Sequence, residues 1–191
     1  MSALPNLTPD LKGKIAIISG ATRGIGRVCA FALAKRGCNI VVAAKTVEPQ
    51  PTLPNTIFSV AKEIRDQGGG DALPFQINLR DASRAEECVK AAVEQWPNHT
   101  GIILINNASA LWWQEMVDTP ISKYNLITEI NCRGAFALTK ACMPHMLSAK
   151  WGRVINMSPP IRTDYQAYKG MTAYNISKMV GHRLLLSVFL I

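Results

Sequence analysis

The feature that most constrains the fold is a glycine-rich turn set between a strand and a helix near the N-terminus. The apolar run Lys14–Ser19 (KIAIIS) predicts a buried strand, and the pattern after the turn predicts a helix that ends at Gly37. We expect this helix to bury one face, made of Ile25, Val28, Cys29, Ala32 and Leu33. The turn itself is Ser19-Gly20-Ala21-Thr22-Arg23-Gly24-Ile25-Gly26.

Such a turn lets the backbone come close to a ligand, and the helix that follows directs its N-terminal N–H groups at a negative charge. A glycine pattern by itself also fits a purely structural turn. The strand before it and the helix after it favour a pyrophosphate site. We therefore predict that a nucleotide contacts Gly20, Ala21, Thr22, Arg23, Gly24, Ile25 and Gly26.

Strand-like and helix-like segments alternate along the rest of the chain. Four further strands are predicted, at Asn39–Ala44, Ala72–Leu79, Ile102–Asn106 and Arg153–Met157. Apolar positions between them mark helices from Ile57 to Ile64, Ala85 to Val93, about Ile121 to Leu147 and from about Ala173 onward. Repeated βαβ units predict an α/β fold, a doubly wound parallel sheet of the Rossmann type with strand order 3-2-1-4-5.

Length and charge narrow the class of protein. The 191 residues suit one domain, taken here as 1–191, and the net charge of +8 suits an anionic ligand. The sequence contains no nucleic-acid recognition motif beside this positive charge, so we expect no nucleic-acid partner. The apolar run Leu184–Ile191 is too short to span a membrane. Five scattered cysteines without metal-ligand spacing predict reduced thiols and no metal.

Compartment is predicted from what the ends of the chain lack. The N-terminus has no signal-peptide pattern, so we expect an intracellular protein, cytoplasmic by default, with mitochondrial and peroxisomal locations left open.

The residues after the second strand indicate which nucleotide is bound. NAD-binding units usually carry an acidic residue there, whereas this chain has Ala43-Ala44-Lys45-Thr46. Arg23 in the glycine-rich turn should lie at the same edge of the sheet. Two cations suit a 2′-phosphate, which predicts NADP, although Lys45 could also be an ordinary solvated lysine.

A tyrosine and a lysine four residues apart near the C-terminus suggest acid–base chemistry. Tyr174 and Lys178 share a helix face, and an ammonium near the phenol favours the phenolate and lowers the tyrosine pKa. Tyr165 and Lys169 have the same spacing but follow Pro159-Pro160 in an expected loop. Tyr174 is therefore the predicted general acid and base.

The motifs together resemble the short-chain dehydrogenase/reductase family. The resemblance runs from about Lys12 to about Lys178, through Ser19–Gly26, Asn106-Asn107-Ala108, Asn131 and Tyr174-x-x-x-Lys178. Within the family the chain is most similar to the hydroxysteroid dehydrogenase-like protein 2 group. That likeness is carried by Ala43–Thr46, the proline-bearing loop after it, Asn106–Ala110 and Ser158-Pro159-Pro160.

The resemblance implies a role for each of these positions. Tyr174 handles the proton at the substrate oxygen, and Lys178 holds the nicotinamide ribose. Asn131, at a helix irregularity, supports a water linked to Lys178. Asn106, Asn107 and Ala108 line the cofactor, and Asn78 contacts adenine where the family commonly has Asp. Plain alternatives are a locally bonded Asn131 and a simple turn at Asn107.

Two departures from the family pattern affect the expected activity. Pro159 stands where the family usually has its catalytic serine, so Ser158, one residue earlier, either takes that role or merely ends the strand. The family's sixth and seventh strands and its substrate-covering segment have no counterpart, so we expect a C-terminally incomplete fold. On that expectation the 191-residue chain is a poor catalyst, sticky in solution.

These observations predict an NADP-dependent oxidoreductase that moves a hydride between nicotinamide and a carbonyl or secondary alcohol. The alternative is an NADP-binding fragment or truncated product with impaired catalysis. Four aromatic residues in loops, Trp112, Trp113, Tyr165 and Tyr168, hint at a bulky, lipid-like substrate, or else at surface or dimer packing. By resemblance, the helices around Ala135–Leu147 and Ala173–Leu186 should form a homo-oligomer contact.

Overall fold

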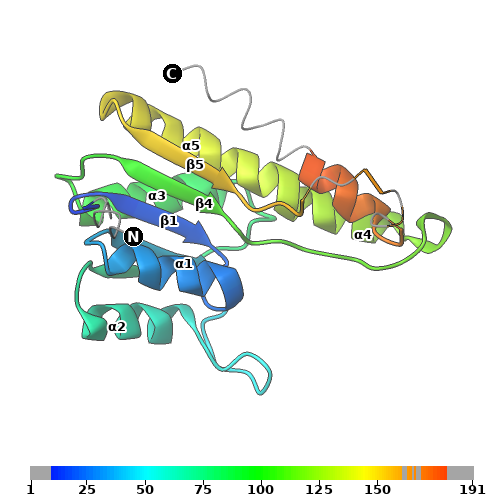
Figure 1. Ribbon diagram of the computed structural model, residues 1–191, viewed down its shortest axis with the longest axis horizontal. Coiled ribbons are helices and arrows are strands. Elements are labelled where there is room, and N and C mark those ends of the chain that lie inside the picture. Colours follow the sequence, from blue (N-terminus) through cyan, green and yellow to red (C-terminus); the bar gives the residue numbers. More distant parts are fainter. Residues whose placement is uncertain (1–9, 161–162, 165, 167–168, 180–191) are drawn as a thin grey trace, which may run out of the picture.

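The fold is a five-stranded parallel sheet covered by helices on both faces (Figure 1). It is seen in a computed structural model that describes residues 10–160, 163–164, 166 and 169–179. The strands lie in the order β3-β2-β1-β4-β5, which confirms the predicted order. Their bounds are β1 Ile15–Ser19, β2 Asn39–Ala44, β3 Ala72–Gln76, β4 Ile102–Asn106 and β5 Gly152–Asn156.

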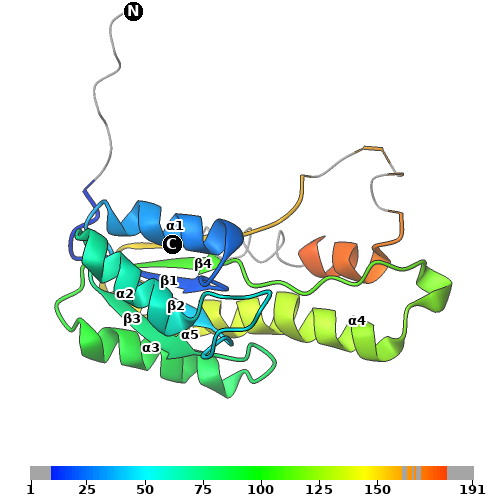
Figure 2. The ribbon, with the colours of Figure 1, turned by 90° about the horizontal axis from the view of Figure 1, so that it is seen from below.

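Helices cover both faces of the sheet, as Figure 2 shows. Helices α1 (Gly24–Ala34) and α2 (Ile57–Gln67) pack on the face formed by side chains such as Ile18 and Val42. Helices α3 (Ser83–Gln95) and α5 (Ala135–Ser148) pack on the opposite face, against Ile17 and Leu104. The α/β doubly wound prediction is thus confirmed, and both faces of the central strands are removed from water.

Burial along the strands follows their place in the sheet. Every residue of β1 and β4 is buried, because each strand has a neighbour on both sides and helices on both faces. β3 and β5 are less buried, and β3 carries Pro74, which an edge strand tolerates because one side needs no hydrogen-bond donor. β3 ends at Gln76 rather than at the predicted Leu79, and β5 begins at Gly152, one residue earlier than predicted.

The buried face of α1 agrees with the prediction only in part, since Cys29 and Leu33 pack against the core but other predicted residues do not. Ile25 and Val28 are 60% and 65% exposed, whereas Gly26, Ala30 and Ala34 are buried against the sheet. The physical reason is the glycine-rich turn, which brings the first turn of α1 so close to β1 that only small side chains fit between them. Helix α1 also ends at Ala34, before the predicted Gly37.

The long helix predicted between β4 and β5 is interrupted. It consists of α4 (Ile121–Thr128), a π-helical turn η2 (Glu129–Gly134) and α5, preceded by a short 3-10 turn η1 (Met116–Asp118). The buried Met146 lies 19 residues after the buried Ile127, whereas five α-helical turns take about 18 residues. The π turn accommodates the extra residue, so both α4 and α5 keep an apolar side toward the protein. A last helix is described over 172–179.

Candidate active site

The predicted site residues meet at the carboxyl edge of the sheet. Because all strands are parallel, the loop after β1, Lys45 after β2, Asn78 after β3, Asn107 after β4 and Ser158 after β5 leave the sheet on the same side. Ligands of open α/β sheets bind at this edge, near the point where the strand order reverses, here between β1 and β4. The switch point therefore coincides with the predicted site.

The loop from Gly20 to Gly26 has the close backbone approach that a phosphate site needs. Gly20 has a φ of +70°, a conformation that glycine adopts readily. A Cβ atom on Gly26 would lie 2.5 Å from the Gly20 carbonyl oxygen, so no larger residue fits there. Ala21 and Thr22 are buried, whereas Arg23, Gly24 and Ile25 are exposed at the start of α1. The first turn of α1 contains no acidic residue, so nothing in that turn opposes an anion.

Ser19 joins the ends of β1 and β4 and was not among the predicted site residues. Its hydroxyl accepts hydrogen bonds from the backbone N–H groups of Asn107, at 3.0 Å, and Ala108, at 3.1 Å. The Asn107 side chain donates in return to the Ser19 carbonyl at 3.0 Å and to the Gly20 carbonyl at 3.3 Å. Asn107 thus supports the glycine-rich loop through its own hydrogen bonds.

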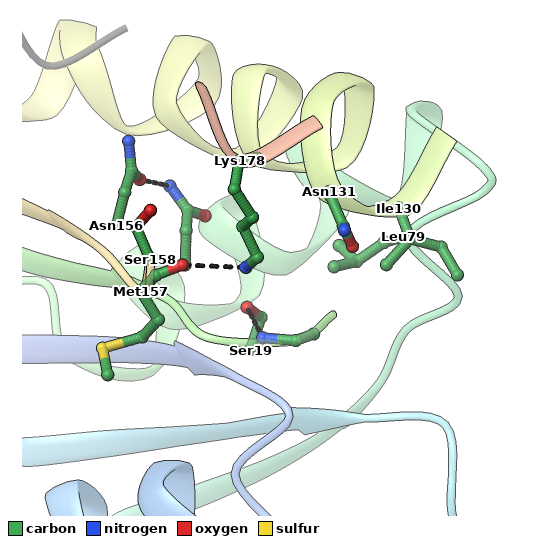
Figure 3. Close-up of a pocket in the computed structure, with 11 residues that line it drawn as sticks. Ser19, Leu79, Ile130, Asn131, Asn156, Met157, Ser158 and Lys178 are labelled. Atoms are coloured by element: carbon green, nitrogen blue, oxygen red, sulfur yellow. Dashed lines mark hydrogen bonds between the residues drawn. The ribbon is translucent and has the colours of Figure 1, made fainter. Parts of the chain in front are cut away.

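A small pocket lies beside this junction, and Asn131, Ser158 and Lys178 line it together (Figure 3). Lys178 is only 9% exposed, and its Nζ donates to the Met157 carbonyl at 2.8 Å. Burial lowers the pKa of the Lys178 ammonium, an effect that the neighbouring Cys132 partly offsets. The structure therefore brings together three of the predicted side chains, which come from η2, the segment after β5 and the last helix.

Asn131 is held by hydrogen bonds on both ends of its amide. Its Oδ1 accepts from the Ala110 N–H at 2.8 Å, and its Nδ2 donates to the Ala110 carbonyl at 3.0 Å and to Ser177 Oγ at 2.9 Å. The Ser177 hydroxyl donates to the Tyr174 carbonyl at 2.7 Å. The buried Asn131 therefore ties the β4–α4 segment to the helix that carries Tyr174 and Lys178.

Tyr174 differs in its electrostatics from the prediction. Burial raises the pKa of its phenol, whereas the sequence argument predicted a lowered pKa. The Lys178 Nζ lies 5.6 Å from the centroid of the Tyr174 ring and donates a hydrogen bond to the Met157 carbonyl. Desolvation of the phenolate on burial is the cause of the raised pKa. The rival Tyr165 lies outside the described residues.

The ends of β4 and β5 carry a pair of amides, of which the resemblance placed Asn106 beside the cofactor whereas the predictions overlooked Asn156. Asn106 and Asn156 occupy opposing positions in the register of β4 and β5, and the Asn106 amide donates to Asn156 Oδ1 at 2.8 Å. Both line the pocket, and the buried Oδ1 of Asn106 has no hydrogen-bond partner in the described structure. An asparagine at the end of each of two neighbouring strands was the signal that could have identified this pair. Ser158 and Pro159, which follow Met157 after the end of β5, are exposed.

Two cations stand at the nucleotide end of the site. Ser19 pairs with Ala43 in the sheet, so Lys45 follows β2 directly beside the glycine-rich loop that carries Arg23. Both side chains are exposed. Asn78 is also exposed, and its Oδ1 accepts from the Arg80 N–H at 3.3 Å.

Comparison with known proteins decides the family. The profile of the family described as short chain dehydrogenase matches residues 14–188, nearly the whole chain. The chain belongs to the short-chain dehydrogenase/reductase family. The resemblance to this family predicted from the motifs is thereby confirmed.

Individual relatives support the same assignment. The chain is 42% identical over 172 residues to hydroxysteroid dehydrogenase-like protein 2 of Danio rerio, covering 90% of this chain and 40% of that protein. A crystal structure of a short chain dehydrogenase from Mycobacterium thermoresistibile has a TM-score of 0.79 and 35% identity, over 89% of this chain and 59% of that one. A metagenomic short-chain oxidoreductase solved in complex with NADP has a TM-score of 0.78 and 25% identity, over 94% and 75%.

The chain spans about two fifths of the length of the curated relatives it matches.

Within the described residues, no helix combines the length and apolarity needed to cross a membrane. The same residues contain no cluster of three His, Cys, Asp or Glu side chains that could hold a metal ion.

Proposed function

We propose that this protein is an NADP-dependent oxidoreductase that acts on a carbonyl or secondary alcohol. The observation that carries the proposal is the convergence of Lys178, Asn131 and Ser158 on one pocket, with Tyr174 one helical turn before Lys178. The pocket adjoins Ser19, which begins the glycine-rich loop, so a nucleotide on that loop would extend toward these side chains.

The residues around the pocket divide the chemistry between them. A bound nicotinamide supplies the hydride donor or acceptor. Tyr174 gives its phenolic proton to the substrate oxygen during reduction and takes it back during oxidation. Lys178, whose Nζ lies 5.6 Å from the centroid of the Tyr174 ring, supplies a positive charge near the phenol. Asn131 holds the Tyr174–Lys178 helix through Ser177. Ser158 orients the substrate oxygen.

The preference for NADP rests on charge at the adenosine end. The residue that follows β2 is Lys45, where an NAD-binding unit usually has an acid that accepts from the ribose hydroxyls. Lys45 and Arg23 are exposed and can turn toward a 2′-phosphate. The NADP complex of the metagenomic relative supports the same choice.

A chain that binds NADP without turnover is the second candidate. It is favoured by the exposure of Ser158 beside Pro159 and by the raised pKa of Tyr174, since a neutral phenol is a weaker base. Spectrophotometric oxidation of NADPH with a panel of carbonyl substrates separates the two candidates.

The decisive experiment compares two tyrosine variants. Tyr174→Phe removes one hydroxyl, so it should abolish at least about 99% of turnover, the usual scale of acid–base catalysis, while NADPH still binds. Tyr124→Phe alters an exposed tyrosine on α4 and should leave turnover unchanged. Equal activity of wild type and Tyr174→Phe would refute the assigned role.

Substrate, assembly and compartment extend the proposal. Trp112 and Trp113 are 36% and 69% exposed in the segment after β4 and would receive a bulky apolar substrate. Exposed apolar side chains on α4 and α5, Ile121, Phe136 and Leu147, support a homo-oligomer, which sedimentation velocity would test. Tyr168 lies outside the described residues, as does the predicted partner helix beyond residue 179. An intracellular location stays a prediction.

A further inference from the structure

Three charged side chains outside the pocket join the π turn η2 to the loop after β3. Arg80 Nε donates to Glu129 Oε2 at 2.7 Å, and Arg133 Nη2 lies 3.6 Å from Glu129 Oε1. The same Arg133 nitrogen donates to the Arg80 carbonyl at 2.7 Å. Glu129 opens η2 and Arg133 lies near its end, so both ends of the π turn are attached to one short loop.

Close packing reinforces this attachment. A Cβ on Gly134, the last residue of η2, would lie 2.8 Å from the Leu79 Cβ and 3.1 Å from the Leu79 carbonyl oxygen. Leu79 is 7% exposed and lines the pocket, so the loop after β3 is itself anchored in the core. The backbone of η2 therefore rests directly on a fixed support and cannot shift without breaking that contact.

The opposite side of η2 carries Asn131. Its amide bonds Ala110 and Ser177, which belong to the β4–α4 segment and the Tyr174–Lys178 helix. A π turn is rare and occurs mostly as a single turn inside an α-helix. If these residues became α-helical, the same residues would wind further round the helix axis. The flanking segments would then be rotated by about 100° relative to each other, the angle that one residue takes up in an α-helix. Asn131 would then no longer face Ser177.

We propose that Arg80, Glu129 and Arg133 form an ionic clamp that keeps η2 in its π-helical form and so positions Asn131 beside the Tyr174–Lys178 helix. The hydrogen bond from Arg80 is the main cause of a lowered pKa of Glu129, so the carboxylate stays charged at neutral pH. These are positioning residues, and their effect on the reaction rests on the proposed oxidoreductase function. The clamp itself can be tested without any turnover.

The first measurement follows the Asn131 side chain. Hydrogen exchange of its Nδ2 amide protons is read by NMR, with the signal assigned through Asn131→Ala. Glu129→Gln and Arg80→Gln should each speed this exchange by about threefold to fivefold, the scale of a partly exposed ion pair. The double variant should be no faster than Glu129→Gln alone, because Glu129 takes part in both ion pairs and Arg80→Gln removes only one of them. Glu94→Gln, which removes an exposed α3 ion pair with Lys90, is the matched control and should change nothing.

The second measurement is turnover of the wild type and the same variants. Glu129→Gln should lower kcat with little change in the KM for NADPH, because the displaced group is Asn131 and not the nucleotide loop. Unchanged exchange in Glu129→Gln, or equal acceleration in Glu94→Gln, would overturn the clamp. Faster exchange with an unaltered kcat would overturn its role in the reaction. A wild type without turnover would count against the proposed function, and amide exchange would still decide whether the clamp exists.

Discussion

Among single residues, the carboxyl edge of the sheet has a fixed half and an adaptable half. Asn131, Ser177 and Lys178 are buried and hydrogen-bonded to the protein, so their positions are set before any ligand arrives. Arg23 and Lys45 at the nucleotide end are exposed. Preorganised groups suit the step in which bonds change, whereas mobile cations suit recognition of a charged phosphate.

Lys45→Asp should separate the two nicotinamide cofactors. Removing a charge-assisted contact and adding a like charge should weaken NADPH binding by about 10- to 100-fold. NADH binding should hold or improve, because an acid can accept from the ribose hydroxyls. Fluorescence titration measures both affinities, with Lys140→Asp on α5 as a control for net charge. Equal losses for NADPH and NADH would contradict a 2′-phosphate contact.

Among whole elements, helix α1 shows how far sequence reasoning reaches. Its existence and place followed from the glycine-rich turn, and the strands followed from their isoleucine and valine runs. Its buried face followed only in part, because large apolar residues such as Val28 normally mark the core, whereas here the fully buried positions of α1 are small residues. The π turn was equally hidden, since it depends on one extra residue within a long helical pattern. Of the site, the motif residues were predictable, and Ser19 and Asn106 belong to those motifs. Asn156 was not predictable, because its contact with Asn106 arises from the pairing of β4 with β5.

Gly26→Ala should disrupt the start of α1. The new Cβ would lie 2.5 Å from the Gly20 carbonyl oxygen and 2.5 Å from Asn107 Nδ2, so the helix must move away from β1. Overpacking of this kind costs about 1–3 kcal/mol of unfolding free energy, and the nucleotide loop should lose its shape. Urea unfolding and NADPH titration measure the two effects. Val28→Ala, on the exposed face of the same helix, should change neither, and a Gly26→Ala variant with wild-type stability would show that the close approach is not required.

For the whole molecule, the carboxyl and amino edges of the sheet carry different groups of side chains. The carboxyl edge holds the candidate active site, whereas the amino edge gathers His99, His145, Lys14 and Trp151 between the start of the strands and the end of α5. The His99 and His145 rings meet edge to face with centroids 6.4 Å apart, and Lys14 lies over the Trp151 ring. Cationic and titratable groups therefore lie close together at the edge away from the pocket.

This amino-edge cluster should make the fold sensitive to mild acid. Burial, followed by the proximity of His145 and Lys14, lowers the pKa of His99 below its ordinary value of 6.5. The native state then binds fewer protons than the unfolded chain, so His99 supports folding fully above pH 6.5 and loses that support as the pH falls through its lowered pKa. Because the ring is partly exposed, the loss of unfolding free energy should be no more than about 1 kcal/mol.

Urea unfolding at pH 7.5 and pH 5.0 measures this loss. The variant His99→Gln, whose side chain cannot be protonated, should lose less stability than the wild type between the two pH values. NADPH binding, at the opposite edge, should respond alike in wild type and variant. An identical loss of unfolding free energy in both proteins would show that His99 does not carry the acid sensitivity.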